Sequence, residues 1–206
     1  MEQAVHIARS ELILGGQKSG KSRRAELLAR TWLQTAGHHA TLIATAQAHD
    51  AEMHARIARH QRERAERVPG LQLVEEPRDL AGALAKHSRA DTLLIVDCLT
   101  LWLTHWLMPA PGAGRTAGAA TTSFEQNQAS AGVFEAQCAL FFVALEQSPG
   151  PVILVGNEIG LGVIPLGREV RAFVDALGLL NQRAAAACQR VTLMAAGLAL
   201  TLKDTP

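Results

Sequence analysis

Short runs of apolar residues recur along the chain, and turn signals separate them. Most of these runs are continuous instead of alternating with polar residues, as expected for strands that are covered on both faces. Segments with apolar residues at helical spacing lie between them, which is typical of βα units and a parallel sheet. We predict strands over residues 11–15, 40–45, 71–75, 92–97, 151–157, 190–196 and 198–203, the last antiparallel to the one before it.

The intervening segments carry the apolar periodicity of helices. Ala25, Leu28, Trp32 and Ala36 recur on one helical face, and Gly37 marks a plausible helix end. Further helices are predicted after a cap at Asp50, over 78–87, over 134–147, and over 168–189, where Gly178 is expected to bend or interrupt the helix.

Residues 109–132 show no periodicity and are rich in Pro, Gly, Ala, Ser and Thr. Such a segment offers little apolar surface to offset the entropy that is lost on ordering it. We therefore predict a flexible insertion within one domain that spans residues 1–206.

The composition excludes several classes of protein. With 19% charged residues and a net charge of +1, the chain is not a basic nucleic-acid binder. Its three cysteines match neither a disulfide framework nor a zinc spacing, so we expect reduced thiols and a cytoplasmic location. No apolar run approaches the ~18 residues of a membrane span, and the first residues lack a secretory signal, so no membrane insertion is expected.

Residues 15–22, GGQKSGKS, satisfy the pattern GxxxxGK[ST] between a predicted strand and a predicted helix. The glycines allow a tight turn whose amides point inward, and the helix start adds a positive dipole. Lys21 would reach the outer phosphates of a nucleotide and Ser22 would hold Mg²⁺. Asp97 ends a predicted strand and would be the second magnesium ligand, whereas taken alone it would sooner be read as the cap of the following helix.

The predicted helix after residue 50 carries a histidine among apolar and basic residues. Met53, Ile57 and His60 share one helical face, so spacing alone favours a packed histidine. The neighbouring arginines would by default form a solvated basic face, and they are Arg56, Arg59, Arg62 and Arg64.

Polar groups also follow the predicted strand at 151–157. Asn157 and Glu158 lie at its carboxyl end, where the ligands of α/β sheets gather, and the next helix carries Arg168 and Arg171. These four residues are candidate substrate contacts. A flexible turn and ordinary helix pairs are the alternatives.

Seven stretches occur in the order found in one enzyme family: GGQKSGKS, ATAQAHDAEMHARIARH, EEP, VDCLTLWLT, NEIGLGVIP, GLLNQRAAA and AAGLALTLK. From about Leu12 to Lys203 the chain resembles the bifunctional adenosylcobinamide kinase / adenosylcobinamide-phosphate guanylyltransferase family of cobalamin biosynthesis. We accordingly expect an α/β P-loop NTPase fold of the RecA-like type, with a mainly parallel central sheet flanked by helices.

The resemblance implies two activities in one chain. The first phosphorylates adenosylcobinamide with ATP or GTP, and the second transfers GMP from GTP through a guanylylated histidine to give adenosylcobinamide-GDP. Alignment on ARIARH makes that histidine His60, with Lys21 as the other catalytic residue. The expected nucleotide contacts are Gly15, Gly16, Gln17, Lys18, Ser19, Gly20, Lys21, Ser22, Ala44, Thr45, Ala46, Gln61, Arg62, Glu63, Arg64, Glu75 and Asp97.

The chain departs from the family at four of its motif positions. Leu14, Lys18, His105 and Gly156 stand where threonine, arginine, asparagine and serine are common, which bears on substrate affinity more than on reaction type. The resemblance also implies a homo-oligomer, such as a trimer, although no sequence feature counts subunits.

Other P-loop functions stay open at this point. They are a RecA-like ATPase that handles DNA, another P-loop small-molecule kinase, and a nucleotide-dependent switch. The near-zero net charge, the absence of tyrosine and the five phenylalanines argue against the DNA-handling ATPase.

Overall fold

The computed structural model describes residues 6–47, 51–108 and 123–205, without the side chains of residues 51–54, 56 and 123–131. Its centre is a seven-stranded sheet with the order β3-β2-β4-β5-β1-β6-β7. All neighbours pair in parallel except β7, which is antiparallel to β6. The strands, each of which confirms a predicted one, are β1 (Ser10–Gly15), β2 (His39–Ala44), β3 (Leu71–Glu75), β4 (Thr92–Asp97), β5 (Val152–Val155), β6 (Arg190–Ala195) and β7 (Leu198–Asp204).

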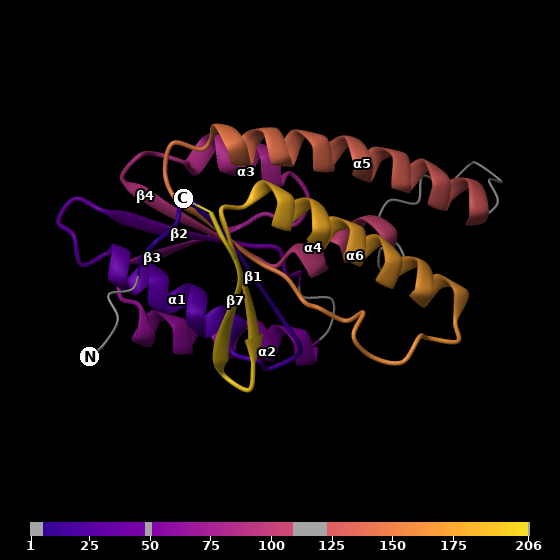
Figure 1. The fold of residues 1–206 in the computed structure, drawn as a ribbon, viewed down its shortest axis with the longest axis horizontal. Helices are drawn as coiled ribbons and strands as arrows, with labels where there is room; N and C mark the ends of the chain where they lie inside the picture. The colour runs from indigo at the N-terminus through magenta and orange to yellow at the C-terminus, as the bar shows by residue number, and fades with distance from the viewer. Residues whose placement is uncertain (1–5, 48–50, 109–122, 206) are drawn as a thin grey trace.

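Helices cover both faces of this sheet, with α1 and α2 on one side and α3 to α6 on the other (Figure 1). Their bounds are α1 (Lys21–Trp32), α2 (Ala51–Arg67), α3 (Leu80–His87), α4 (Leu99–Leu107), α5 (Ser123–Gln147) and α6 (Arg168–Ala187). None of the helices in the described part of the chain is both long and apolar enough to cross a membrane.

The two covered faces explain why the apolar runs are continuous. Leu12 and Leu14 of β1 point into the core under α3 to α6, whereas Ile13 between them points into the core under α1. Because successive side chains of a strand point to opposite faces, a sheet buried on both sides needs apolar residues at every position.

The structure differs in part from three expectations about local structure. The loop predicted over residues 109–132 gives way to helix from Ser123, where α5 begins. Residues 123–131 contain no proline or glycine, and a helix already anchored by Phe134 and Phe141 extends at little cost. Residues 109–122 and the predicted cap at Asp50 lie outside the described residues.

Gly178 does not interrupt α6, and α1 ends at Trp32, ahead of Gly37.

The parallel register brings the carboxyl ends of the strands into one row. Ala44 pairs with Asp97, Asp97 pairs with Val155, and Val155 pairs with Ile13. Strand β1 therefore ends two residues beyond this row, at Gly15. The turn between β1 and α1 consequently begins at the edge of the sheet where β2, β4 and β5 also end.

The backbone of Gly15 passes very close to the neighbouring strand β6. A Cβ atom added to Gly15 would lie 2.5 Å from the carbonyl oxygen of Met194 and 2.5 Å from Oγ of Ser19. Its φ of 154° also lies in a region that side chains rarely adopt. A side chain at this position would therefore push the turn away from the sheet.

We predict that Gly15→Ala lowers the free energy of unfolding by about 1–3 kcal/mol, because the added methyl group overpacks this contact. Gly16→Ala is the matched control, since open space surrounds a Cβ there, and we expect it to change stability by less than about 0.5 kcal/mol. Urea unfolding without nucleotide measures both variants. Equal losses of stability would contradict the close approach seen at Gly15.

Candidate active site

The turn between β1 and α1 forms a closed loop at the carboxyl edge of the sheet. The backbone N–H of Ser19 donates to the carbonyl of Gly16 at 3.3 Å, and the N–H of Gly197 in the β6–β7 turn donates to the carbonyl of Ser19 at 3.0 Å. Gly20 and Lys18 both have positive φ, at 103° and 55°. This arrangement has the shape of a phosphate-binding loop that is braced from outside by the β6–β7 turn.

Lys21 begins α1 and bends back across this loop. Its Nζ donates to the carbonyl of Gly16 at 2.6 Å, and the residue is buried. Burial lowers the pKa of Lys21, although the nearby Cys98 and Asp97 oppose that shift. The lysine therefore lies at the loop that would receive the phosphates, whereas Gly16, Gln17 and Lys18 are exposed around it.

Ser22 and Asp97 meet beside the loop, as the sequence predicts. The hydroxyl of Ser22 donates to Oδ2 of Asp97 at 3.0 Å. Burial raises the pKa of Asp97, while Arg64, the Ser22 hydroxyl and Lys21 oppose that rise. The alternative that Asp97 caps the next helix is wrong, because α4 begins after Cys98 without any side-chain cap.

Thr45 lies next to Asp97 but is fully buried. Its hydroxyl accepts from the N–H of Cys98 and donates to the Cys98 carbonyl, both at 2.8 Å, across the cis peptide bond between Asp97 and Cys98. His105 Nε2 lies 2.7 Å from the Thr45 carbonyl. Thr45 therefore positions the backbone that follows Asp97, and its contact with nucleotide stays a prediction.

The three cysteines are all free and buried. Burial raises the pKa of Cys98, Cys138 and Cys188 to about 12 in each case. A thiol with so high a pKa is a poor nucleophile at neutral pH. Cys98, which follows Asp97 directly, is therefore a poor candidate for a nucleophile.

His60 is exposed on α2, with 49% of its side chain accessible. A packed histidine, the interpretation that spacing alone favours, is therefore wrong. Its Nδ1 lies 4.0 Å from Oε2 of Glu63. An imidazole at the surface of a helix is open to a substrate.

Helix α2 is held against α1 by a buried carboxylate that the sequence analysis did not identify. Glu26 of α1 is buried, and it accepts from Arg67 Nε at 2.7 Å and from Arg64 Nε at 3.4 Å. The only signal for it in the sequence is an acidic residue inside the apolar face of α1. Arg64 therefore belongs to an ion-pair network and not to a solvated face, and the Arg56 side chain lies outside the described ones.

This network links the two helices that carry Ser22 and His60. Both α1 and α2 follow parallel strands, so both run away from the carboxyl edge of the sheet. Glu26 contacts Arg64, and one turn nearer that edge stand Ser22 on α1 and His60 on α2. His60 thus stands one turn before Arg64 on α2, as Ser22 stands one turn before Glu26 on α1.

The remaining predicted nucleotide contacts lie around α2 and the ends of β2 and β3. Gln61 Nε2 donates to Glu75 Oε1 at 3.4 Å, which joins α2 to the end of β3. Arg62 is exposed, and Glu63 accepts from Arg67 at 3.4 Å. Ala44 and Ala46 are half-buried at the end of β2.

A second polar group lies on the other side of the loop, at the end of β5. The N–H of Glu158 donates to the carbonyl of Gly15 at 3.1 Å, and Asn157 N–H donates to the hydroxyl of Thr100 at 2.9 Å. Asn181 of α6 donates from Nδ2 to the Asn157 carbonyl at 3.0 Å and to Glu158 Oε2 at 3.4 Å. Asn157 and Glu158 are thus brought to the phosphate-binding loop, and Thr100 is a partner that sequence reasoning missed.

The two predicted arginines of α6 do not join this group. Arg171 donates to the carbonyls of Pro165 and Leu166, and Arg168 is exposed at the first residue of the helix. Of the four departures from the family, Gly156 is buried close to Asn181 and to the buried Leu14, and His105 is buried beside Thr45.

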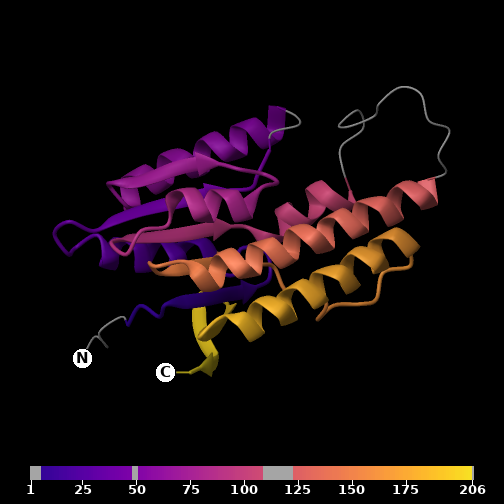
Figure 2. The ribbon, with the colours of Figure 1, turned by 90° about the horizontal axis from the view of Figure 1, so that it is seen from above.

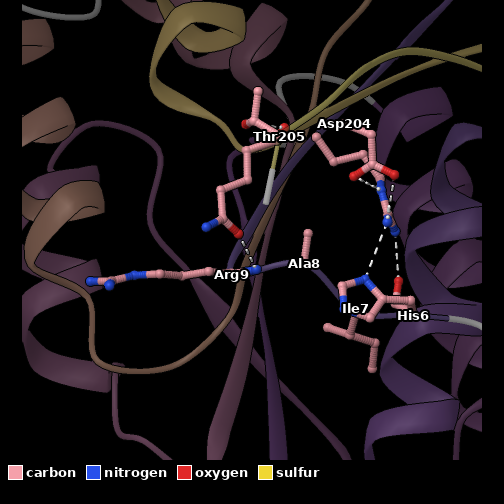
Figure 3. Close-up of a pocket in the computed structure, with 8 residues that line it drawn as sticks. His6, Ile7, Ala8, Arg9, Asp204 and Thr205 are labelled. Atoms are coloured by element: carbon pink, nitrogen blue, oxygen red, sulfur yellow. Dashed lines mark hydrogen bonds and ion pairs between the residues drawn. The ribbon is translucent and has the colours of Figure 1, made fainter.

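A separate cavity of about 650 Å³ lies at the opposite edge of the sheet (Figure 3). It is lined by residues around the start of β1 and the end of β7. Arg190 lines the cavity, and its guanidinium is already paired: it binds Asp204 at 3.0 Å and the carbonyl of His6 at 2.6 Å. None of the predicted site residues lines this cavity.

Comparisons with known proteins agree with this geometry. A family model described as cobinamide kinase / cobinamide phosphate guanyltransferase matches residues 11–202. The bifunctional adenosylcobalamin biosynthesis protein CobP of Pseudomonas aeruginosa is 43% identical over 196 residues, covering 95% of this chain and 98% of that protein. The protein CobU of Escherichia coli, described in the same words, is 31% identical over 192 residues, covering 93% of this chain and 98% of its own.

Among solved structures, the flagellar accessory protein FlaH from Methanocaldococcus jannaschii aligns with a TM-score of 0.50 at 12% identity. The alignment covers 97% of this chain and 80% of that one, and it supports the RecA-like P-loop fold alone. The match of the family model over nearly the whole chain, with two relatives above 30% identity, shows that this chain belongs to the cobinamide kinase / cobinamide phosphate guanylyltransferase family.

Proposed function

We propose that the chain phosphorylates adenosylcobinamide with ATP or GTP and then transfers GMP from GTP to the product, giving adenosylcobinamide-GDP in cobalamin biosynthesis. The observation that carries this proposal is that α1 connects the phosphate-binding loop to the helix that carries His60. The phosphate-binding loop and Ser22 open this helix, and Glu26 of the same helix holds the helix that presents His60. One bound triphosphate would thus have a cradle for its phosphates and a nucleophile near them.

The loop from Gly15 to Ser22 would bind the phosphates through its backbone amides, with Lys21 neutralising charge on the outer ones. Mg²⁺ would be held by Ser22 and Asp97, whose oxygens lie 3.0 Å apart. This pair fits Mg²⁺, which takes one or two protein ligands together with phosphate and water oxygens. When bound, Mg²⁺ neutralises negative charge on the phosphates. No group of three His, Cys, Asp or Glu side chains among the described residues could hold a metal without such a nucleotide.

In the kinase step the acceptor hydroxyl oxygen attacks the γ-phosphorus. The bond from that phosphorus to the bridging oxygen breaks, the nucleoside diphosphate leaves, and the hydroxyl proton passes to solvent. Asn157 and Glu158 lie beside the phosphate-binding loop, because the Glu158 backbone contacts Gly15. This position supports a role for both residues in the kinase step. We assign both to contact with the acceptor, and we assign Arg168 to the same side of the site.

In the transfer step an imidazole nitrogen of His60 attacks the α-phosphorus of GTP, and pyrophosphate leaves. A phosphate oxygen of the phosphorylated acceptor then attacks the same phosphorus, and the P–N bond breaks to release the imidazole. Splitting the GMP transfer into these two steps replaces one difficult displacement by two easier ones. The exposure of His60 supports this role, because the large acceptor must approach the guanylylated imidazole.

We further propose that the enzyme is a cytoplasmic homo-oligomer, such as a trimer, which acts on nucleotides and a corrinoid and not on nucleic acid. Buried, protonated thiols support a reducing compartment. Three exposed leucines on the edge strand β7 support self-association, and they are Leu198, Leu200 and Leu202.

We predict that His60→Ala abolishes the acid-labile label that α-labelled GTP leaves on the protein, because the nucleophile is gone. Phosphorylation of adenosylcobinamide by ATP should persist within about threefold, since only the transfer step uses the imidazole. His39→Ala is the matched control, because His39 is also exposed but begins β2 at the opposite edge of the sheet. Normal labelling of the His60 variant would refute the assignment.

We also predict that Glu26→Gln slows guanylylation of His60 by about 10- to 100-fold while the kinase rate stays within about threefold, because Arg64 and Arg67 lose the charge that places α2. Glu11→Gln is the control. Glu11 is a buried carboxylate whose hydrogen bonds, among the described side chains, go to Arg24 and Thr192 and not to α2.

The two variants are compared in rates per folded molecule, with urea unfolding measured alongside. We expect Glu11→Gln to lower stability without changing the ratio of the two rates. A proportional fall of both activities in the Glu26 variant would show that Glu26 stabilises the fold without positioning His60.

A further inference from the structure

The segment from residue 159 to residue 167, here the 159–167 loop, exposes an unusual amount of aliphatic surface. It joins β5 to α6 and swings away from the sheet beneath α6 (Figures 1 and 2). Contiguous apolar surface that is left exposed usually marks a binding site. The exposed fractions are 42% for Ile159, 80% for Leu161, 96% for Val163, 76% for Ile164 and 98% for Leu166.

This loop starts directly at the phosphate-binding loop. Glu158, the residue before it, donates its N–H to the carbonyl of Gly15, and Gly160 N–H donates to Glu158 Oε1 at 3.0 Å. The carboxylate of Glu158 and the amide of Asn181 lie together at its base. The aliphatic surface is therefore continuous with polar groups that border the phosphate site.

The far end of the loop is also held in place. Arg171 of α6 donates from one guanidinium nitrogen to the carbonyls of Pro165 and Leu166. These bonds occupy backbone oxygens on the side of the loop that faces α6. The loop is thus fastened at both ends while its aliphatic side chains point away from the core.

We propose that the 159–167 loop is the docking surface for the macrocycle of the corrinoid acceptor. This inference rests on the proposed function, because the acceptor's hydroxyl must reach a triphosphate at Lys21. A corrinoid is a broad ring that carries methyl groups and amide side chains, so its body needs an apolar surface with polar groups beside the phosphate site. The 159–167 loop has the aliphatic surface, and Asn157 and Glu158 supply acceptors for amide N–H groups.

Exposed aliphatic residues elsewhere among the described ones include three leucines of the edge strand, which form a less suitable surface. Leu198, Leu200 and Leu202 lie on β7, which forms the free edge of the sheet and runs from the carboxyl edge toward the opposite one. An open edge strand favours pairing with another chain. The corrinoid is therefore assigned to the loop and a second copy of this chain to the edge strand.

The test is the double variant Leu161→Ser/Val163→Ser. Both side chains are exposed, so the fold should be unaffected, and melting temperature verifies this. Equilibrium dialysis with adenosylcobinamide, followed by its visible absorbance, measures the dissociation constant without turnover. We expect that constant, and the KM for adenosylcobinamide in the kinase assay, to rise about tenfold or more, since apolar contact with the ring is lost.

The KM for nucleotide and the labelling of His60 by GTP should stay unchanged in this variant. Leu198→Ser/Leu200→Ser is the matched control and should leave corrinoid binding unchanged. Unchanged corrinoid binding in the loop variant would overturn the proposal, as would a wild-type protein that does not bind adenosylcobinamide. A loop variant that changes only the mass measured by sedimentation would assign the loop to a second copy and would also overturn it.

Failure of the proposed function gives a different result. A wild-type protein that binds adenosylcobinamide but neither phosphorylates nor guanylylates it would refute the function. Loss of that binding in the loop variant alone would still support the docking surface.

Discussion

The hydrogen bond between Ser22 and Asp97 joins the two elements on which the site depends. Ser22 stands at the start of α1, directly after the phosphate-binding loop, and Asp97 ends a strand that is two places away from β1 in the sheet. Only the parallel register of β1, β5 and β4 brings these ends to one edge. A slip of one residue in either pairing would turn Asp97 to the other face of the sheet and separate the two oxygens.

A second set of charges extends this site to α2. Glu26 is buried on α1, so its carboxylate needs strong partners, and Arg64 and Arg67 supply them from α2. The charge of Arg64 also lowers the pKa of Asp97, against the rise that burial causes. Helix α1 therefore opens at the phosphate-binding loop and, one turn later, binds α2, the helix of the proposed nucleophile His60.

The sheet could be predicted from the sequence because a strand that is buried on both faces leaves a continuous apolar run, as in residues 92–97. The contacts between helices could not be predicted, because the sequence does not show which residues of α2 pair with a buried acid such as Glu26. Spacing alone misassigned His60 for the same reason, since the face shared with Ile57 is only partly covered. The hydrogen bonds of the Thr45 hydroxyl to the Cys98 backbone could not be predicted either, because they join the ends of two strands that are distant in the sequence. The helix over 123–132 escaped notice because its composition resembles that of a loop.

The central claim is that Asp97 and Ser22 hold the metal of a nucleotide bound in the Gly15–Ser22 loop. Titration calorimetry of GTP into Asp97→Asn and the unaltered protein, each with and without Mg²⁺, tests it most directly. The account predicts that Mg²⁺ tightens GTP binding by about tenfold or more in the unaltered protein and by much less in the variant. An equal gain from Mg²⁺ in both proteins would contradict it.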